Sequence, residues 1–196
     1  MFGTTKSPQE SLEKAFELAQ KAIVLDEGYP ACHHILGWLY CFKREYDKAI
    51  TEGERAVVLN PSGADSHSMY GRILTLAGRK EEAIPMIQKA IRLNPFPPSS
   101  YYLYLGDALQ NTGRFEEAVS ADKKAIQIAP DNIIAHTSLT ATYSMMGREK
   151  DARAEAAEVL RISPKYSLDY FAKTSPYKDQ SEIDKITNAL RKAGLK

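Results

Sequence analysis

The chain has 196 residues, of which 43% are hydrophobic and 26% are charged, and its formal net charge is +1. This is the composition of an ordinary globular protein. Acids and bases are mixed along the whole length, which argues against a nucleic-acid or anionic-membrane surface. No apolar run approaches the roughly 20 residues that span a bilayer, and residues 1–9 lack the apolar segment of a signal peptide. We therefore expect a cytoplasmic protein with no nucleic-acid or membrane partner.

The first expected element is a helix that begins at Ser7, after a flexible start at residues 1–6. Ser7 has the place of an N-cap, Pro8 suits the first helical position, and Glu10 completes a capping box. Apolar residues then recur at helical spacing as far as Leu25. This helix has no partner preceding it in the chain.

Residues 30–166 contain four blocks of one design, each expected to form two helices. The blocks span 30–63, 64–97, 99–132 and 133–166, with one extra residue close to the prolines at 97 and 98. A period of this length is typical of stacked helical repeats. Every block has a small residue in its first helix and an alanine at the facing position of its second. These pairs, which let the helix backbones approach closely, are Gly37–Ala49, Gly71–Ala83, Gly106–Ala118 and Thr140–Ala152.

A glycine ends the first helix in three of the four blocks, at Gly78, Gly113 and Gly147. Glycine is favoured there because the chain must adopt a left-handed backbone conformation. The block at 30–63 has Arg44 at this place. We therefore expect a strained or differently shaped turn at Arg44.

The shared positions resemble the tetratricopeptide repeat (TPR), a family built from 34-residue helix-turn-helix units. The resemblance covers residues 7–166, and residues 7–29 match only the second helix of a repeat. It implies an all-α fold, an α-α superhelix (TPR solenoid) of antiparallel helix pairs. It also implies that a concave groove binds a protein or peptide partner. A chaperone partner is not expected, because the paired Lys and Asn of the family's carboxylate clamp are missing.

The resemblance further implies which side chains face that groove. In TPR proteins a stripe along each first helix lines the concave surface. The candidates from this stripe are His34, Trp38, Cys41, Arg72, Leu103, Asp107 and Thr137. Trp38 is the expected anchor, since aromatic side chains dominate interface energetics. The alternative is that Trp38 packs against neighbouring helices and binds no ligand.

Residues 167–196 leave the repeat pattern and are expected to cap its end with a capping helix. A short helical turn at Ser167–Lys173 precedes an amphipathic helix at Ser181–Ala193, which Gly194 closes. Three segments, NPFPPSSYYLYLG (94–106), YSLDYFAKTSPYKDQSEID (166–184) and LRKAGL (190–195), resemble the C-terminal TPR region of bacterial class III adenylate/guanylate cyclases. The resemblance implies a regulatory region of a larger cyclase-type signalling protein, with the catalysis outside this chain.

The sequence indicates no catalytic, metal or cofactor site, and we expect no enzyme. His33, His67 and His136 share one repeat position, but a helix pair separates them, too far to share an ion. They are expected to pack in the core. Cys32 and Cys41 lie roughly 13 Å apart along one helix, too far for a disulfide, and are expected to be free thiols. No glycine-rich phosphate loop is present.

Two classes of function are left open, the groove-binding module and a self-assembly element. The second would follow if the unpaired N-terminal helix left Leu12 and Phe16 near water, so that two copies associate through it.

One residue does not fit the repeat pattern, whichever function applies. Asp122 occupies a helix–helix position, and we expect its carboxylate to reach the edge or to find a tyrosine or a basic group.

Overall fold

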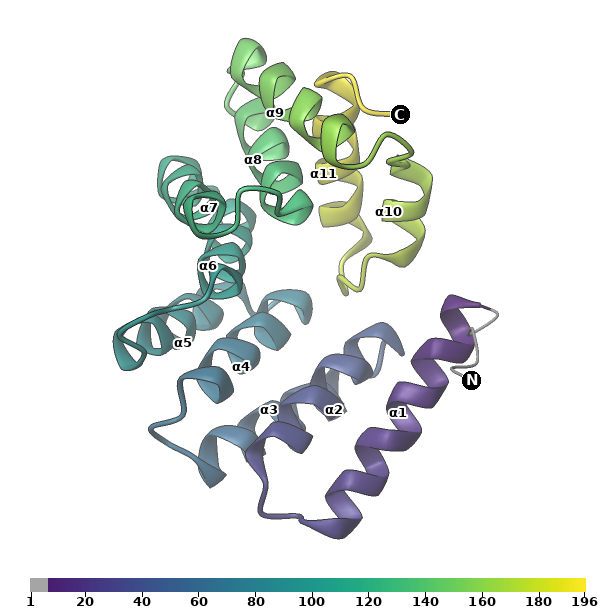
Figure 1. Cartoon of the computed structure of the whole chain (residues 1–196), viewed down its shortest axis with the longest axis vertical. Coiled ribbons are helices and arrows are strands. Elements are labelled where there is room, and N and C mark those ends of the chain that lie inside the picture. The colour runs from purple at the N-terminus through teal and green to yellow at the C-terminus, as the bar shows by residue number, and fades with distance from the viewer. Residues whose placement is uncertain (1–6) are drawn as a thin grey trace.

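Residues 7–196 are described by the computed structural model, and within them every regular element is an α helix (Figure 1). The helices are α1 (Pro8–Leu25), α2 (Pro30–Phe42), α3 (Tyr46–Leu59), α4 (Ala64–Leu76), α5 (Lys80–Leu93), α6 (Ser99–Asn111), α7 (Phe115–Ile128), α8 (Ile133–Met145), α9 (Glu149–Ile162), α10 (Leu168–Thr174) and α11 (Gln180–Lys192). In this part of the chain no helix is both long and apolar enough to cross a bilayer.

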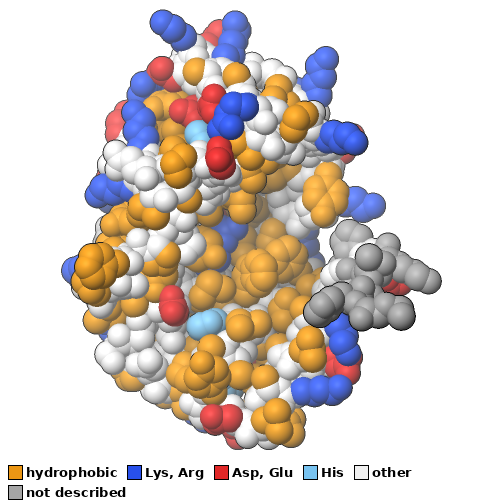
Figure 2. Space-filling model, in the orientation of Figure 1, with side chains coloured by type: hydrophobic (Ala, Val, Ile, Leu, Met, Phe, Trp, Pro, Cys, Tyr) orange, Lys and Arg blue, Asp and Glu red, His pale blue; other side chains and the backbone are white. Residues whose placement is uncertain are grey.

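The helices α2 to α9 form four antiparallel pairs that stack into a curved array (Figure 1), and the space-filling view shows a hollow on its inner side (Figure 2). Figure 2 shows that hydrophobic side chains gather inside this hollow. The predicted all-α superhelix is confirmed. Its close helix contacts depend on small residues: a Cβ atom on Gly71 would lie 2.4 Å from Ile87 Cγ1 and 3.0 Å from the Ala83 carbonyl oxygen.

The turns between paired helices follow the glycine pattern of the sequence. Gly78, Gly113 and Gly147 have φ values of 85°, 77° and 74°. Arg44 has φ 62° and is the one non-glycine residue of the described chain with positive φ. The expected strain at Arg44 is confirmed, and such a conformation costs an L-residue about 1–2 kcal/mol.

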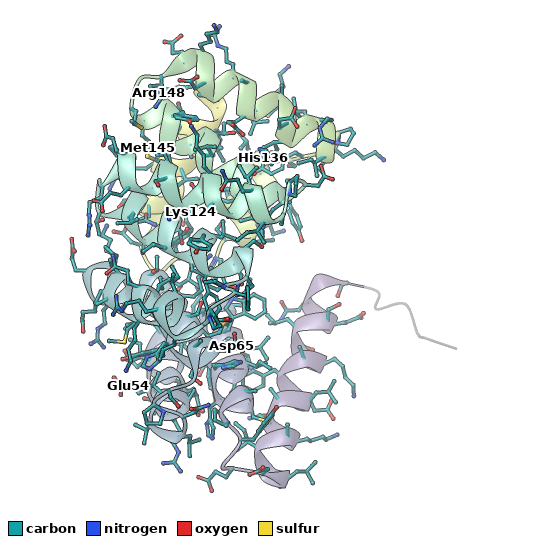
Figure 3. All side chains as sticks on the ribbon, turned by 60° about the vertical axis from the view of Figure 1, so that its left-hand side comes forward. Glu54, Asp65, Lys124, His136, Met145 and Arg148 are labelled. Carbon is teal, nitrogen blue, oxygen red and sulfur yellow. The ribbon has the colours of Figure 1, made fainter. Side chains whose placement is uncertain are left out.

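The three histidines at the shared repeat position are buried and join neighbouring repeats. The Nε2 atoms of His33, His67 and His136 each donate to the backbone carbonyl six residues earlier, at 2.8, 2.8 and 2.9 Å. The Nδ1 atoms of His33 and His136 also lie 2.7 Å from the carboxylates of Glu52 and Glu155. Figure 3 shows His136 beside the ribbons of α8 and α9. The histidines are therefore structural, and in three of the four repeats they fix the loop that enters the repeat.

The expectation for Asp122 is wrong, because this side chain is fully buried in α7. Ser138 Oγ donates to one carboxylate oxygen at 2.8 Å, and the other oxygen has no partner among the described residues. Ser138 occupies the place where the preceding repeats have the large side chains of Ile35, Met69 and Tyr104. Burial raises the pKa of Asp122 well above its usual range.

Helix α1 packs against α2 through the residues that were expected to lie near water. Leu12 and Phe16 are half-buried in a cluster with Leu36 and Leu39, and the Phe16 ring meets Tyr40 edge to face at 5.1 Å. One partner helix is enough to cover this side, so the expectation of exposure is wrong. The large apolar residues of α1 that are exposed are Leu18, Val24 and Leu25.

The C-terminal segment contains the expected capping helix, α11, whose buried residues include Ile183, Ile186 and Leu190. Helix α11 packs against α8 on the inner side of the array, and α10 lies towards the start of α1 (Figure 1). The residues between them, Ser175–Lys178, cross the hollow, where the Lys178 amide donates to the Leu76 carbonyl at 2.8 Å. We call Ser175–Lys178 the strap.

Candidate functional site

The centre of the concave surface is filled by Tyr177 of the strap. The Tyr177 side chain is buried, and its hydroxyl donates to the Asp107 carboxylate. Arg72 forms an ion pair with the same carboxylate, and its guanidinium lies 5.5 Å from the Tyr104 ring and 5.8 Å from the Tyr177 ring. The side chains of Arg72 and Asp107 are 18% and 10% exposed, so the pair is largely withdrawn from water.

Burial, and next the negative charge of Asp107, raise the pKa of Tyr177 well above its usual range. The phenol therefore keeps its proton and donates a hydrogen bond to the carboxylate. A carboxylate that accepts from both a guanidinium and a hydroxyl has charge-assisted bonds, which are stronger than neutral ones. This cluster fixes the strap to α4 and α6.

Arg44 holds the strap from the other side. Its guanidinium donates to the carbonyl oxygens of Ser175, at 2.9 Å, and of Tyr177, and to the Tyr46 hydroxyl at 3.0 Å. The Tyr46 hydroxyl donates in turn to the Pro176 carbonyl at 3.3 Å. A glycine at this turn would relieve the backbone strain but could not reach the strap. Strain of this kind is found where another contact compensates for it.

The structure places the predicted groove residues in three different situations. Cys41, Leu103 and Thr137 are buried, and burial raises the pKa of the Cys41 thiol to about 12. Arg72 and Asp107 are engaged by Tyr177. Only His34, which is half-buried, and Trp38, which is 38% exposed, are left for a partner to touch.

Trp38 lines an open cavity of about 620 Å³ at one end of the concave surface. Its apolar lining comes from Leu12 of α1 and from Trp38, Leu39 and Phe42 of α2, and the Trp38 and Phe42 rings meet edge to face at 5.0 Å. The remaining lining residues, which are more polar and come mainly from the start of α1 and from α10, are Ser7, Gln9, Arg44, Tyr170, Lys173, Thr174 and Pro176. We call this the Trp38 cavity.

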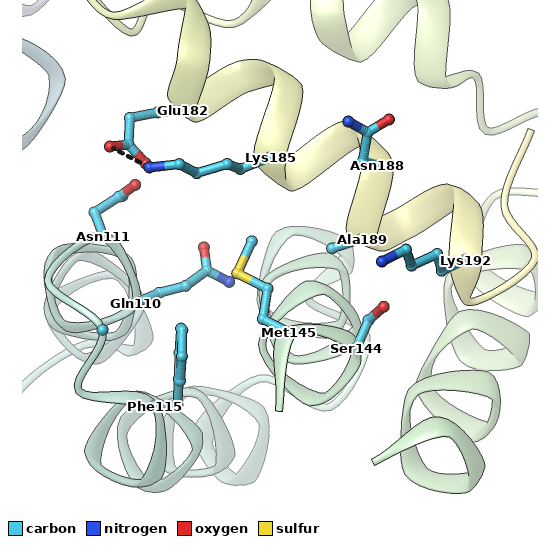
Figure 4. Close-up of a pocket in the computed structure, with 11 residues that line it drawn as sticks. Gln110, Asn111, Phe115, Ser144, Met145, Glu182, Lys185, Asn188, Ala189 and Lys192 are labelled. Carbon is cyan, nitrogen blue, oxygen red and sulfur yellow. Dashed lines mark hydrogen bonds and ion pairs between the residues drawn. The ribbon is translucent and has the colours of Figure 1, made fainter. Parts of the chain in front are cut away.

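A second cavity of about 500 Å³ lies between α6, α8 and α11 (Figure 4). Its lining is polar, but several of the polar groups are already bonded. Gln110 donates to the Ser138 carbonyl and to Thr142 Oγ1, and Lys185 bonds Glu182 at 3.3 Å.

Sequence reasoning did not find the strap or the α10 wall of the Trp38 cavity. One signal was available, since Arg72 and Asp107 occupy the same position in successive repeats and carry opposite charges. A second signal was Arg44, which stands at a turn where the other repeats have glycine. Both cysteines are free thiols, as expected. Within residues 7–196 no group of three His, Cys, Asp or Glu side chains is placed to hold a metal ion.

The comparisons with known proteins agree with this architecture. The family model of the tetratricopeptide repeat matches residues 36–98 and 77–133, which together make up half of the chain. The protein O-mannosyl-transferase Tmtc3 of Drosophila melanogaster is 31% identical over 77 residues, which are 38% of this chain and 8% of that protein. The chain thus spans a small part of that relative's length.

Two solved structures have a similar fold. PilW, a widely conserved type IV pilus biogenesis factor, is 20% identical with a TM-score of 0.73, over 94% of this chain and 82% of that one. YrrB, described as a TPR protein with an unusual peptide-binding site, is 22% identical with a TM-score of 0.58, over 91% of this chain and 92% of that one. At these identities the likeness is one of fold.

Proposed function

The chain belongs to the tetratricopeptide repeat family, and we propose that it is an interaction module that binds a protein or peptide segment in the Trp38 cavity. TPR domains typically bind such partners and are not usually enzymes. The observation that carries the proposal is the Trp38 side chain, 38% exposed in an apolar cavity. Large aromatic residues in such positions are the usual anchors of an interface.

The strap supports this location. Tyr177 already fills the middle of the concave surface, and Arg72 and Asp107 are bonded to it. A partner that used the whole groove would have to displace these contacts. A partner in the Trp38 cavity displaces none of them. YrrB, which has a similar fold, is described as binding a peptide, and we propose the same general kind of ligand here.

We also propose that the module regulates a larger cyclase-type signalling protein of a bacterium. The support is the resemblance of segments 94–106, 166–184 and 190–195, which in this structure lie at related places. Tyr101, from the first segment, donates to Asp65 of the preceding repeat at 2.5 Å. The second contains the strap, and the third buries Leu190 and Leu195 in the core beside α8.

We propose a cytoplasmic location because Cys32 and Cys41 are free thiols, which suit a reducing compartment. The module is proposed to have no nucleic-acid partner, because its charges are mixed and its net charge is +1.

The test is a selection of short random peptides displayed against the purified chain, followed by affinity measurement on variants. Trp38→Ala should weaken the selected peptides at least about fivefold, which is the loss of a significant interface contact. Val58→Ala is the matched control, since Val58 is 66% exposed on α3 and lines neither cavity. The proposal fails if no peptide is selected, or if Trp38→Ala binds as well as the wild type.

A second candidate function is self-association through α1. The specific observation is that Leu18, Val24 and Leu25 are 53%, 86% and 87% exposed on this helix. Leu12 and Phe16 would take part only if α1 left α2 and exchanged between copies. Sedimentation of a Leu18→Glu/Val24→Glu variant tests the exposed face, and a Leu12→Glu/Phe16→Glu variant tests exchange. A wild type that stays monomeric at high concentration rules out both.

A further inference from the structure

We infer that the segment bound in the Trp38 cavity is acidic and carries a carboxylate side chain next to a large apolar one. The inference rests on the proposed function and specifies the chemistry of its partner. Two independent features of the cavity carry it, an uncompensated positive charge and an apolar floor.

The positive charge comes from Arg44 and Lys173, both exposed residues that line the cavity. The hydrogen bonds of Arg44 go to neutral oxygens, two backbone carbonyls and the Tyr46 hydroxyl. Lys173 forms no hydrogen bond or ion pair with the described residues. No Asp or Glu lines the cavity in this part of the chain. A third cation, Lys43, lies just outside the lining, with its ammonium 3.9 Å from the centre of the Phe16 ring.

The other repeats show how unusual this arrangement is. Three of them have an arginine directly after the turn glycine, and each of these pairs with an acid three residues further along, at 2.6 to 2.7 Å. The pairs are Arg79–Glu82, Arg114–Glu117 and Arg148–Asp151. In the turn at Arg44 the two places carry the opposite charges, because Glu45 follows the turn residue and pairs with Lys48. Arg44 itself stands where the other repeats have glycine, and none of the ion pairs of the described residues includes it. The cavity therefore has a cationic edge that a carboxylate from outside can neutralise.

The apolar floor specifies the second half of the ligand. Leu12, Trp38, Leu39 and Phe42 surround a volume of about 620 Å³, and Tyr170, 59% exposed, stands at the rim. A cavity of this size and polarity suits a buried anchor with a few polar contacts around it. A leucine or phenylalanine can pack on the Trp38 and Phe42 rings while a neighbouring Asp or Glu reaches Lys173 or Arg44. A free inorganic anion would use the cations but leave this floor empty.

The experiment compares two displayed peptide pools built around a fixed phenylalanine. In one pool the flanking positions are neutral or acidic, and in the other they are neutral or basic. We expect the acidic pool to be strongly enriched on the wild type. Its peptides should bind Lys173→Glu about two- to fivefold more weakly than the wild type, the usual size of one surface charge contact. High salt should weaken their binding to the wild type and reduce the difference between wild type and variant. Lys150→Glu, an exposed residue of α9 outside both cavities, should change nothing.

Each outcome has a separate meaning. Equal enrichment of the basic pool, or unchanged binding to Lys173→Glu, overturns the inference, and the proposed function survives if the selected peptides still depend on Trp38. Displacement of the peptide by inorganic phosphate, beyond that by chloride of equal ionic strength, overturns it in favour of an anion site. If neither these pools nor random peptides bind, both the inference and the proposed function fail.

Discussion

The strap is attached through a buried charge, so removing that charge should have a large effect on stability. In Asp107→Ala the Arg72 guanidinium keeps its largely buried position, with its side chain 18% exposed, and loses its one carboxylate partner among residues 7–196. The Tyr177 hydroxyl loses its acceptor at the same time. Breaking a buried ion pair by removing one partner costs about 3–5 kcal/mol of unfolding free energy.

Two further variants divide this cost between the groups. Tyr177→Phe removes only the hydroxyl bond and should cost about 1.5–3 kcal/mol, as for a hydrogen bond to a charged group. Arg72→Met/Asp107→Leu removes both charges, so neither is left unpaired. The double variant should lower the unfolding free energy by much less than Arg72→Met and Asp107→Leu do when their separate effects are added. The reason is that apolar replacement of a whole buried ion pair is often close to neutral.

The assay is urea denaturation followed by circular dichroism, with amide hydrogen exchange at Lys178 to report the strap. The control is Glu82→Ala, which breaks the surface pair Arg79–Glu82, 41% and 58% exposed, and should cost no more than about 1 kcal/mol. The reasoning is refuted if Asp107→Ala costs no more than Glu82→Ala. It is also refuted if the double variant costs as much as the sum of the single ones.

Three more predictions concern single side chains. Arg44→Gly should speed hydrogen exchange at the Lys178 amide while leaving the repeats folded, because it frees the strap and relieves a backbone strain of about 1–2 kcal/mol; exchange as slow as in the wild type would contradict it. Because Asp122 has a raised pKa in the folded state, its contribution to stability is greatest below the unfolded carboxyl pKa of about 4 and is lost as pH rises through the raised value. In Asp122→Asn the melting temperature should no longer carry this decline between acid and neutral pH. A pH profile of the melting temperature that matches the wild type would contradict the prediction. His136→Ala should cost about 1–3 kcal/mol, since the Pro130 carbonyl and Glu155 lose their bonds to the ring, and a thermal melt like that of the wild type would show that these bonds contribute nothing.

The repeated part of the fold could be predicted because its causes are local. Gly71 and Ala83 allow one close helix contact, Gly78 allows one left-handed turn, and the other repeats make the same choices except for Arg44 and Thr140. The strain at Arg44 could be predicted for the same reason, as a departure from a rule that the other turns obey.

The concave surface could not be predicted, because it depends on contacts between distant parts of the chain. Tyr177 meets Asp107 across 70 residues, and Arg44 meets Ser175 across 131. No periodicity marks such pairs. Candidates taken from one stripe of each repeat therefore included Cys41, Leu103 and Thr137, which are buried. They missed Lys173 and Tyr170, which lie in α10 outside the repeats.

The central claim is that a protein segment binds against Trp38, and the chain contains its own reporter, since Trp38 is the only tryptophan. The decisive measurement is Trp38 fluorescence during titration with a selected peptide that contains no tryptophan. The account predicts a blue shift and reduced quenching by acrylamide that saturate together with binding, because the half-exposed ring becomes buried. Saturable binding that leaves both the emission and the quenching of Trp38 unchanged would contradict it.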